Sequence, residues 1–598
     1  MIAPMTKYSF ILLSGQQDGF LETLQDIGLV DITRSVKPVD EKSASILSRA
    51  AAMKETISAL GYADTADAQP VPLDGDPASA GRHALSELSA ALDRKAALEK
   101  EAARRRPWGQ FNPEALDALT SLGYKIRYYS VATKQFNPAW AEKYPLQVVS
   151  EEGGKTFFVT IVPPGEEGYF LPADEVEAPG GSYLESEAEI AGTDEKIALE
   201  RGRILSARER IPEISAMYDQ ALSELDLYLA GAASVPAADD TLVTFVGYAP
   251  TESDLTVTEA LDKTGAFYLK EAATKEDRPP IKFRNSRFVK MFEVLTDMYG
   301  RPAYDGFDPT PFIAVFFLLF FAFCMGDAGY GLILILAGLA MKKMKSLSSM
   351  SPLVVTLGVG TTVIGFLFHT FFSMDIAGWS IFQPIKWIFL PSKIMGYDGT
   401  MVLAIIVGIV HLSIAMIMKG LTETRQKGFV NCLGTWGWTL LFVGGVCVAG
   451  LALTGVLDKS LTKWTIIVIG VLSAIGIFLL NNVHRNPLIN IGSGLWDTYN
   501  TVTGLLGDVL SYLRLYALGL AGAMLGKAFN DIGLMVLGDG SNFVMWIPFI
   551  LIVLVGHTLN IAMCVLGAFV HPLRLNFLEF FKNSGYEAAG RSYKPLKK

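Results

Sequence analysis

The residues with the most chemical potential lie in the last third of the chain, where ionisable side chains interrupt apolar runs. Arg514 stands in the run GDVLSYLRLYALGLAGAMLGKAFN, with Asp508 and Ser511 within the two turns before it. A charge near the centre of a bilayer costs at least about 2.5–3.5 kcal/mol, so such a residue usually faces a protein or water interior and serves function. Because arginine keeps its proton in proteins, Arg514 is expected to be a fixed positive charge that repels cations or pairs with a carboxylate.

Glycines follow this arginine at spacings of three and four residues, at Gly519, Gly522 and Gly526. Small residues on a membrane helix allow the backbone of another helix to come very close. The spacing therefore predicts a close helix contact beyond Arg514.

A polar stripe runs along the next apolar segment. Its members recur at steps of three or four residues: His557, Asn560, Cys564, Gly567, His571 and Arg574. This spacing places them on one helix face, and at about 1.5 Å per residue the stripe is about 26 Å long, nearly the depth of the hydrocarbon core. Two interpretations stay open: an aqueous path or relay, and polar contacts between helices. Arg574 lies near the end and could instead extend its charge to the water.

For the other polar residues in apolar surroundings, a structural role is an alternative to a role in function. Asp327 and Tyr330, in MGDAGYG, fit either a polar turn or a vestibule. Asp508 fits an access vestibule or a structural pair equally well. His369 and His411 are isolated in apolar spans and are predicted to be packing residues.

Nucleotide, metal and cofactor sites are not indicated. AGAMLGKA, which ends at Ala528, lacks the first glycine and the Ser/Thr of a phosphate-binding loop and lies within an apolar helix. The four cysteines all lie in the apolar half and form no CxxC pair, so neither a disulfide framework nor a zinc site is predicted. We expect no cofactor and no metal.

These residues belong to a chain of two dissimilar parts. Of the 598 residues, 51% are hydrophobic, but residues 1–305 are rich in charged side chains and residues 311–570 are mostly apolar. This split predicts a soluble domain, residues 1–305, followed by a membrane domain, residues 306–598. The formal net charge of −9 argues against nucleic acid as a partner.

Eight apolar segments are candidates for membrane spans, each of which needs about 20 residues. They are Pro311–Met325, Ala328–Met341, Pro352–Ser373, Met401–Met418, Leu433–Val456, Trp464–Leu480, Thr501–Asn530 and Phe543–Val570. The first two are short, and they fit one broken helix, two tilted helices or a re-entrant pair.

For the first two segments, the distribution of basic residues along the chain favours two separate helices that each cross the membrane. Basic residues cluster at Lys282–Lys290, Lys342–Lys345, Lys419–Lys427, Arg485 and Lys582–Lys598. By the positive-inside rule these segments share the cytoplasmic side, which gives eight crossings and places Asp531–Asn542 outside. The mildly basic loops near Lys386 and Lys459 run against this assignment.

The soluble half combines strands with long helices. Apolar residues recur every seven positions at Ile190, Ile197, Ile204, Ile211, Tyr218 and Leu225, with Ala207, Ile214, Ala221 and Tyr228 three further on. This is a coiled-coil seam, interrupted at Pro212, although a globular helical hairpin is the alternative. Strands are predicted at Tyr8–Leu13, Tyr124–Val131, Thr156–Val162, Leu242–Tyr248 and Ala266–Leu269.

The expected fold is therefore N-terminal cytoplasmic α/β lobes joined by an antiparallel coiled coil, then an all-α membrane domain of eight transmembrane helices, the last two long and tilted. The lobes are placed at about 1–40 with 240–305 and at about 107–180, and the coiled-coil helices at about 41–106 and 183–232.

Several segments resemble one family. FDPTPFIAVFFLLFFAFCMGDAGYGLIL, from Phe307, resembles the first membrane helices of the large stator subunit of V-type and A-type rotary ATPases (ATP synthases), called subunit I in prokaryotes and subunit a in eukaryotes. LSYLRLYALGLA, from Leu510, resembles its arginine-bearing helix, and GAFVHPLRLNFLEFF, from Gly567, its final helix. LVTFVGYAP, at Leu242–Pro250, is similar to a lobe of its cytoplasmic domain. The resemblance covers the whole chain in order, and the length is typical of the prokaryotic branch.

By position, the resemblance implies roles for single residues. Arg514 matches the essential stator arginine, Arg574 the second arginine, and His571 a histidine one turn earlier. Eukaryotic members have a glutamate where this chain has Cys564, so any role of that glutamate must fall to other groups. The expected ion-translocation residues are Arg514, Arg574, His571, Asp508, Ser511, His557, Asn560 and Glu579.

The resemblance also implies a function. Two ion half-channels against a rotating proteolipid ring would couple proton or sodium movement to ATP hydrolysis or synthesis at another subunit. The implied partners are the ring subunit (c/K type), peripheral stalk subunits (E/G type), a central stalk adaptor (C/d type) and the lipid bilayer. The implied location is the plasma membrane, with the N-terminal domain and the C-terminus cytoplasmic. The rivals are a stand-alone ion-coupled secondary transporter, which usually shows two similar halves, and a membrane receptor.

Overall fold

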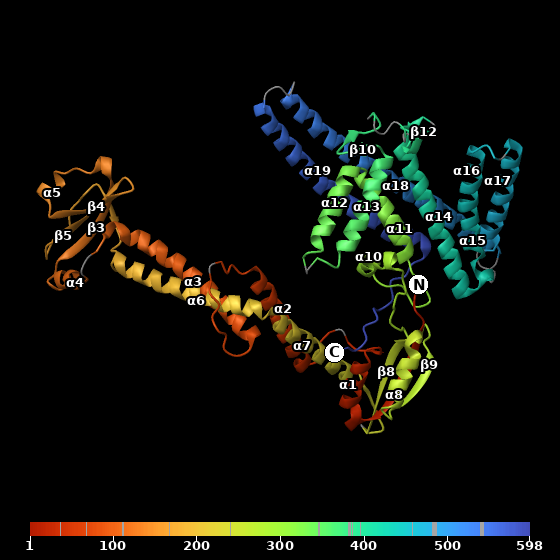
Figure 1. Cartoon of the computed structure of the whole chain (residues 1–598), viewed down its shortest axis with the longest axis horizontal. Coiled ribbons are helices and arrows are strands. Elements are labelled where there is room, and N and C mark those ends of the chain that lie inside the picture. Colours follow the sequence, from red (N-terminus) through yellow and green to blue (C-terminus); the bar gives the residue numbers. More distant parts are fainter. Residues whose placement is uncertain are drawn as a thin grey trace. The chain divides into compact units, whose positions relative to one another are not determined.

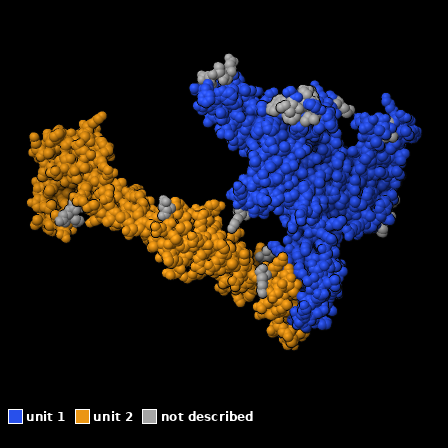
Figure 2. All heavy atoms as spheres, in the orientation of Figure 1, with its two compact units in different colours: residues 1–12, 29–32, 244–595 blue, residues 13–28, 33–243, 596–598 orange. Residues whose placement is uncertain are grey.

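The computed structural model describes residues 1–35, 37–66, 68–110, 113–166, 168–239, 241–344, 347–378, 380, 384, 387–394, 396–456, 458–480, 487–538 and 543–597. The chain is mostly helical, with an α/β region in its N-terminal part (Figure 1). Figure 2 shows its two compact units: residues 1–12, 29–32 and 244–595 form unit 1, and residues 13–28, 33–243 and 596–598 form unit 2. Arg485, Lys345, Lys386 and Asn542, which entered the charge argument, lie outside the described residues, as does Lys598.

One sheet is built mainly in unit 1, with strand order β2-β8-β1-β9. The strands along this path are β1 (Met5–Leu13), β2 (Asp31–Ile32), β8 (Leu242–Pro250) and β9 (Phe267–Ala272), and a fifth strand, β7 (Val235–Ala237), pairs with β8 off the path. β1 runs antiparallel to β9, from Thr6↔Ala272 to Ile11↔Phe267. Because side chains alternate along a strand, Tyr8 and Phe10 point inward and are fully buried. Helix α8 (Asp254–Asp262) adds Val257 and Leu261 to the buried residues of this lobe.

A second sheet lies in unit 2, with strand order β4-β5-β3-β6. Its strands are β3 (Lys125–Ala132), β4 (Leu146–Glu152), β5 (Lys155–Val162) and β6 (Asp174–Val176), with helices α4 (Pro113–Ser121) and α5 (Trp140–Lys143) nearby. Tyr129, Val131, Phe158 and Leu171 form its core. All five predicted strand segments overlap observed strands, so the predicted α/β character of the N-terminal region is confirmed. β4 is a strand that the sequence pattern did not predict.

The described part of unit 2 also contains two pairs of long helices, besides the short helix α1 (Gln17–Ile27). α3 (Pro77–Arg105) packs on α6 (Tyr183–Glu209), and α2 (Glu41–Tyr62) packs on α7 (Ile211–Ala232). The first pair is antiparallel, because Arg94 contacts Glu189 while Glu87 contacts Lys196. The predicted seam is buried at Ile197, Ile204, Ala207, Ile214 and Ala221. The helix break falls at Arg210, beside the expected Pro212. The supercoiling itself stays a prediction.

Unit 1 also holds the apolar helices. Among the described residues, five helices are long and apolar enough to cross a membrane: Gly399–Lys427, Phe429–Leu453, Lys459–Leu479, Leu488–Leu537 and Phe543–Ser584. Three shorter apolar helices precede them: α11 (Thr310–Met325), α12 (Ala328–Met341) and α13 (Ser351–Leu367). α11 and α12 are separate helices, since Gly326 between them is left-handed at φ 54°. Whether all eight segments cross the membrane stays a prediction.

Two element boundaries differ from the sequence prediction. Helix α13 ends at Leu367, so His369 follows the span instead of lying within it. The next residues turn back as a short hairpin, β10 (Thr370–Phe371) with β11 (Met374–Asp375). The penultimate helix, α18 (Pro487–Leu537), has 51 residues, more than the 30–40 that its apolar run suggested. No proline follows Pro487 in this start, so the helix can begin well before the apolar segment.

Candidate functional site

Arg514 lies in the middle of α18, at the edge between its buried and exposed faces. Tyr512 and Leu515 are fully buried in the bundle, whereas Leu510 is largely exposed on the other side of the helix. The guanidinium atom Nη1 of Arg514 is buried, and it has no hydrogen-bond partner among the described residues. A buried donor without a partner is costly. One nitrogen of the Arg514 side chain is thus left without an acceptor in the described part of the chain.

The glycines beyond Arg514 set the contact with α19 (Trp546–Arg574). A Cβ atom added at Gly522 would lie 2.6 Å from Cys564 Sγ, and one at Gly526 would lie 2.9 Å from Asn560 Nδ2. No side chain fits at these distances without a shift of its neighbours. The close approach of a second helix, predicted from the glycine spacing, is therefore confirmed for Gly522 and Gly526.

His411 fixes the buried face of α18 from the side of α14 (Gly399–Lys427). Its side chain is fully buried, and its Nδ1 atom is 3.0 Å from the hydroxyl of Tyr512. Its ring stacks on Phe580 at 4.7 Å and packs on Phe316 at 4.2 Å. The prediction that His411 is a packing residue is confirmed, and its contact with Tyr512 helps to fix the rotation of the helix that carries Arg514.

A buried polar network, the Tyr330 network, joins α12, α18 and α19 on the C-terminal side of Arg514. Its members are Tyr330, Asn530, His557, Asn560 and Cys564. Asn560 Nδ2 donates to the Tyr330 hydroxyl at 2.8 Å and to Gly522 O at 2.9 Å. His557 Nδ1 lies 2.7 Å from the same hydroxyl, and its Nε2 lies 2.9 Å from Asn530 Oδ1. Each of these polar side chains has a partner within the chain, so this part of the stripe is satisfied by internal hydrogen bonds.

Asp327 caps the start of α12 and is buried. Its carboxylate accepts backbone N–H bonds from Gly329 at 2.8 Å and Tyr330 at 3.2 Å. It also accepts the N–H groups of Phe372 and Ser373, which belong to the hairpin 45 residues further on. Asp327 therefore does form a polar turn, and it ties that turn to a second segment.

The other end of the stripe differs in having buried polar atoms without partners. This group, the His571 cluster, comprises Arg514, Ser511, His571, Arg574, Asn576 and Glu579. Among the described residues, His571 Nδ1, Asn576 Oδ1 and Glu579 Oε2 are buried and unpartnered, as Arg514 Nη1 is. The charges of Arg514 and Arg574 both reach His571 electrostatically, and Ser511 lies beside the carboxyl group of Glu579. Arg574 is exposed. Buried polar atoms in such a cluster are ordinarily hydrated.

The helix geometry of the last segment changes within this cluster. After Arg574 the chain continues as a π-helical turn, Leu575–Phe580, before α20 (Phe581–Ser584). π-helical turns are rare and are frequent at functional sites. The turn places Glu579 and Asn576 in the interior, where both are almost fully buried.

Asp508 lies on the N-terminal side of Arg514, at the wall of a polar cavity of about 310 Å³. Lys582 Nζ is 3.3 Å from one of its carboxylate oxygens, and Asn583 Nδ2 donates to the same oxygen at 2.7 Å. Lys419 and Asn500 also line the cavity. Both predictions for Asp508 thus have support, since it is paired and also borders a water-sized space.

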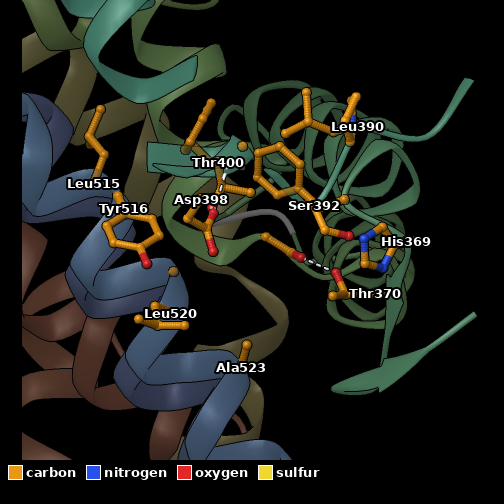
Figure 3. A pocket seen from close by; sticks show the side chains of 16 residues that line it. His369, Thr370, Leu390, Ser392, Asp398, Thr400, Leu515, Tyr516, Leu520 and Ala523 are labelled. Atoms are coloured by element: carbon orange, nitrogen blue, oxygen red, sulfur yellow. Dashed lines mark hydrogen bonds between the residues drawn. The ribbon is translucent and has the colours of Figure 1, made fainter. Parts of the chain in front are cut away.

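A second cavity, of about 250 Å³, lies beside α18 (Figure 3). Leu515, Tyr516, Leu520 and Ala523 line it from α18, and His369, Thr370, Ser392 and Asp398 line it from the connecting segments. At 3.6 residues per turn, Tyr516 and Ala523 are about 160–180° around the helix from Arg514. This cavity does not face the arginine.

The predicted site residues therefore fall into two groups. Tyr330, His557 and Asn560 come together in the Tyr330 network beyond Arg514, with Asp327 behind Tyr330. Ser511, His571, Arg574 and Glu579 gather around Arg514, with Asp508 at the neighbouring cavity. Sequence reasoning missed Asn530, Lys582 and Asn583. Asn530 lies four residues after Gly526 on the glycine face of α18, a spacing that could have identified it. In the described ranges no three His, Cys, Asp or Glu side chains converge as metal ligands.

A match to a known protein family includes both of these groups of site residues. A sequence model of the V-type ATPase 116 kDa subunit family matches residues 235–376 and 497–598, which include Asp327, Arg514 and Arg574.

Over these residues the chain is similar to the V-type ATPase 116 kDa subunit family.

Relatives in prokaryotes extend the family match. The V-type ATP synthase subunit I of Borreliella burgdorferi is 25% identical over the full length of both chains, and subunit I 1 of Treponema pallidum is 26% identical, also over both full lengths. The A-type ATP synthase subunit I of Methanocaldococcus jannaschii is 33% identical over 356 residues, which are 54% of this chain and 49% of that protein. The similarity to this family and the apolar helices together indicate a multi-pass membrane protein.

Proposed function

We propose that the chain is the stator membrane subunit of a V/A-type rotary ATPase, in which Arg514 separates two ion half-channels against a rotating proteolipid ring. Similarity to the V-type ATPase 116 kDa subunit family and relatives named as subunit I support this assignment. The observation that carries it is the guanidinium of Arg514, which is half-buried in an apolar helix with one nitrogen unpartnered among the described residues. A carboxylate on another chain, passing this point, would supply the missing partner.

The proposed role of Arg514 follows from its permanent charge. Two unit charges 4 Å apart interact by about 4 kcal/mol at an effective dielectric constant of 20. That energy favours the ionised form of a ring carboxylate by a factor of about 10³, since each 1.36 kcal/mol is tenfold. The carboxylate would release its bound ion as it reaches Arg514. The same charge repels a free cation and so prevents a direct leak between the half-channels.

The cytoplasmic half-channel is proposed to pass the His571 cluster. Its buried polar atoms without partners need water, and hydrated polar atoms in a row are what an ion or proton path requires. The cavity at Asp508 lies next to this cluster along α18 and would be its vestibule. Lys582, at the wall of that cavity, belongs to one of the basic segments that the positive-inside rule places in the cytoplasm.

The other half-channel is proposed to run along the α18–α19 contact, beside the Tyr330 network. This assignment requires eight crossings, with the three short helices α11, α12 and α13 in the membrane. Both termini are then cytoplasmic, in the plasma membrane. Either a proton or a sodium ion could use such a path, because the ring supplies most of the coordinating groups.

The lobes and helix pairs of the N-terminal part are proposed to hold the stator against torque. The antiparallel pairing of α3 with α6 is supported by several exposed ion pairs and a continuous apolar core. Long paired helices resist bending better than a flexible linker does, which suits contacts with peripheral stalk subunits of the E/G type. The other proposed partners are the ring subunit, the central stalk adaptor and the bilayer. Nucleotide would be bound by another subunit.

The proposal is tested by replacing Arg514 in the assembled complex, reconstituted in vesicles. Arg514→Ala should abolish ATP-driven ion uptake while the ring and ATPase subunits still co-purify. The control is Lys527→Ala, which removes a positive charge from the same helix 13 residues away, on its exposed surface. Uptake that persists in Arg514→Ala at the level of the control would refute the proposed role.

A further inference from the structure

The hairpin β10–β11 that follows α13 has an unusual backbone and no role in the mechanism proposed above. Its strands pair at Thr370↔Asp375 and Phe371↔Met374. The two residues at its tip, Phe372 and Ser373, have φ angles of 48° and 59°. Positive φ at both central positions is a turn geometry that Asn-Gly fits best, and strained backbone of this kind clusters at functional sites. A phenylalanine kept in such a position indicates that its side chain is needed there.

The carboxylate of Asp327 holds this tip in place. Its Oδ1 accepts the N–H of Phe372 at 2.9 Å, and its Oδ2 accepts the N–H of Ser373 at 2.5 Å. The same side chain caps α12 through Gly329 and Tyr330. Four N–H groups on one buried carboxylate fasten the hairpin to the start of the helix that carries Tyr330.

The tip covers one end of the Tyr330 network. The ring of Phe372 packs edge-on against Tyr330 at 5.9 Å and against His557 at 5.6 Å. Its carbonyl oxygen accepts a hydrogen bond from Asn530 Nδ2 at 2.8 Å. Ser373 sits against Gly526, where an added Cβ atom would lie 2.8 Å from the serine Cβ. Phe372 and Ser373 thus lie between the network and the loop side of the membrane domain.

Apart from the bond of Asn560 to Gly522 O, the hydrogen bonds of the network run from Cys564 towards this tip. Cys564 Sγ donates to Asn560, Asn560 donates to Tyr330, and Asn530 donates to Phe372 O. His557 fits between them as a neutral ring, which accepts from Tyr330 at Nδ1 and donates to Asn530 from Nε2. This tautomer follows from the partners. Cys564, at the inner end of the chain, also contacts Gly522, two turns from Arg514 along α18.

We propose that Phe372 and Ser373 form a plug that closes the outer end of the Tyr330 network, with Asp327 as the residue that positions it. Displacement of the plug opens an aqueous route along the α18–α19 contact towards Arg514. That this route leads from the outer side of the membrane towards Arg514 rests on the proposed function. The plug itself is defined by the contacts of Asp327, Phe372 and Asn530.

The test measures access to Cys564 from the outer side of the membrane. The other three cysteines (Cys324, Cys432 and Cys447) are replaced by alanine, and the complex is labelled in oriented vesicles with a small, positively charged, membrane-impermeant methanethiosulfonate. Asp327→Asn should speed outer labelling of Cys564 about tenfold or more, because it removes the carboxylate that holds the tip. Gly526→Ala should do the same without changing a polar group, since its methyl group displaces Ser373 or Asn560.

A matched control and an independent readout keep the test decisive. Gly470→Ala, in α17 (Lys459–Ala474), adds the same methyl group where nothing lies within 4 Å, and it should leave the labelling rate unchanged. ATP hydrolysis by each variant reports whether the complex has assembled. Equal outer labelling rates in assembled wild type, Asp327→Asn and Gly526→Ala would overturn the plug, and so would faster labelling only from the cytoplasmic side. The labelling needs no ion transport, so its result is separate from that of the Arg514→Ala experiment.

Discussion

The polar stripe of α19 has one half whose polar groups are hydrogen-bonded within the chain and one half with buried unpartnered atoms among the described residues, and we predict that Asn560→Leu and His571→Leu distinguish them. Asn560 is fully buried and donates both amide hydrogens, to Tyr330 and to Gly522 O. Leucine would leave these acceptors facing a methyl group. His571 Nδ1 has no partner among the described residues, so leucine there breaks no hydrogen bond at that atom.

The expected magnitudes follow from these contacts. A buried polar group left without its partner costs about 1–3 kcal/mol. For a domain of 150–250 residues, 1 kcal/mol lowers Tm by about 2–4 °C. Asn560→Leu should therefore lower the Tm of the purified subunit by about 2–12 °C. His571→Leu should change the free energy of unfolding by no more than about 0.5 kcal/mol, as is usual away from specific contacts, but it should slow ATP-driven ion uptake severalfold.

The assay combines thermal unfolding in detergent with ion uptake by the reconstituted complex. Thr558→Val is the control on the same helix, because its exposed hydroxyl bonds only to the backbone one turn earlier, at Leu554 O. It should leave both measurements unchanged. A variant Asn560→Leu that keeps its Tm but loses uptake would refute the division, and so would a His571→Leu variant that melts early yet transports at the normal rate.

Two further predictions concern the N-terminal part. Ile204→Ala should destabilise the α3–α6 helix pair by about 2–5 kcal/mol, since Ile204 is fully buried in the apolar core of the pair. Thermal unfolding followed by circular dichroism measures this loss of stability, and an unchanged unfolding midpoint would contradict the prediction. Lys7, at 2.6 Å, and Thr274 lower the pKa of Asp277 from 3.8 to about 2. A lowered carboxyl pKa contributes stability that is present above pH 3.8 and lost as the pH falls through about 2. Asp277→Asn should therefore flatten the decline in Tm between these pH values. An unaltered decline would contradict the assignment.

Local patterns in the sequence predicted much of what lies along single helices. The heptad spacing from Ile190 predicted the buried side of α6 and α7, and Pro212 marked the helix break. The spacing of Gly522 and Gly526 predicted a tight helix contact. These features depend on neighbours within a few turns, whose positions the helical repeat determines. The stripe from His557 to Arg574 was visible for the same reason.

Contacts across long stretches of chain were not predictable in this way. The predicted span Pro352–Ser373 took in the first strand and the tip of the short hairpin at Thr370–Asp375, because these residues are mostly apolar and only their backbone conformation ends the helix. The bond between Asp327 and Ser373 joins segments 46 residues apart, and no local pattern specifies it. β4 was missed because its half-polar sequence, LQVVSEE, lacks a clear alternation.

The site itself was predicted as a set of residues, and the structure divides that set. His557 and His571 lie on one helix face, and nothing in their spacing distinguishes them. Their difference depends on partners from other helices: Tyr330 and Asn530 satisfy His557, whereas His571 faces two arginines. Burial and partnership of this kind arise from tertiary packing, which a single sequence does not show.

The central claim is that Arg514 is a fixed electrostatic barrier between two half-channels, and passive ion leak tests it most directly. The measurement is downhill ion flux through the reconstituted complex without ATP, comparing wild type with Arg514→Gln, which keeps a polar side chain of similar reach but removes the charge. The account predicts that Arg514→Gln conducts ions passively at a rate well above wild type while ATP-driven uptake is lost. A variant that remains as tight to passive flux as wild type, or that still pumps, would contradict it.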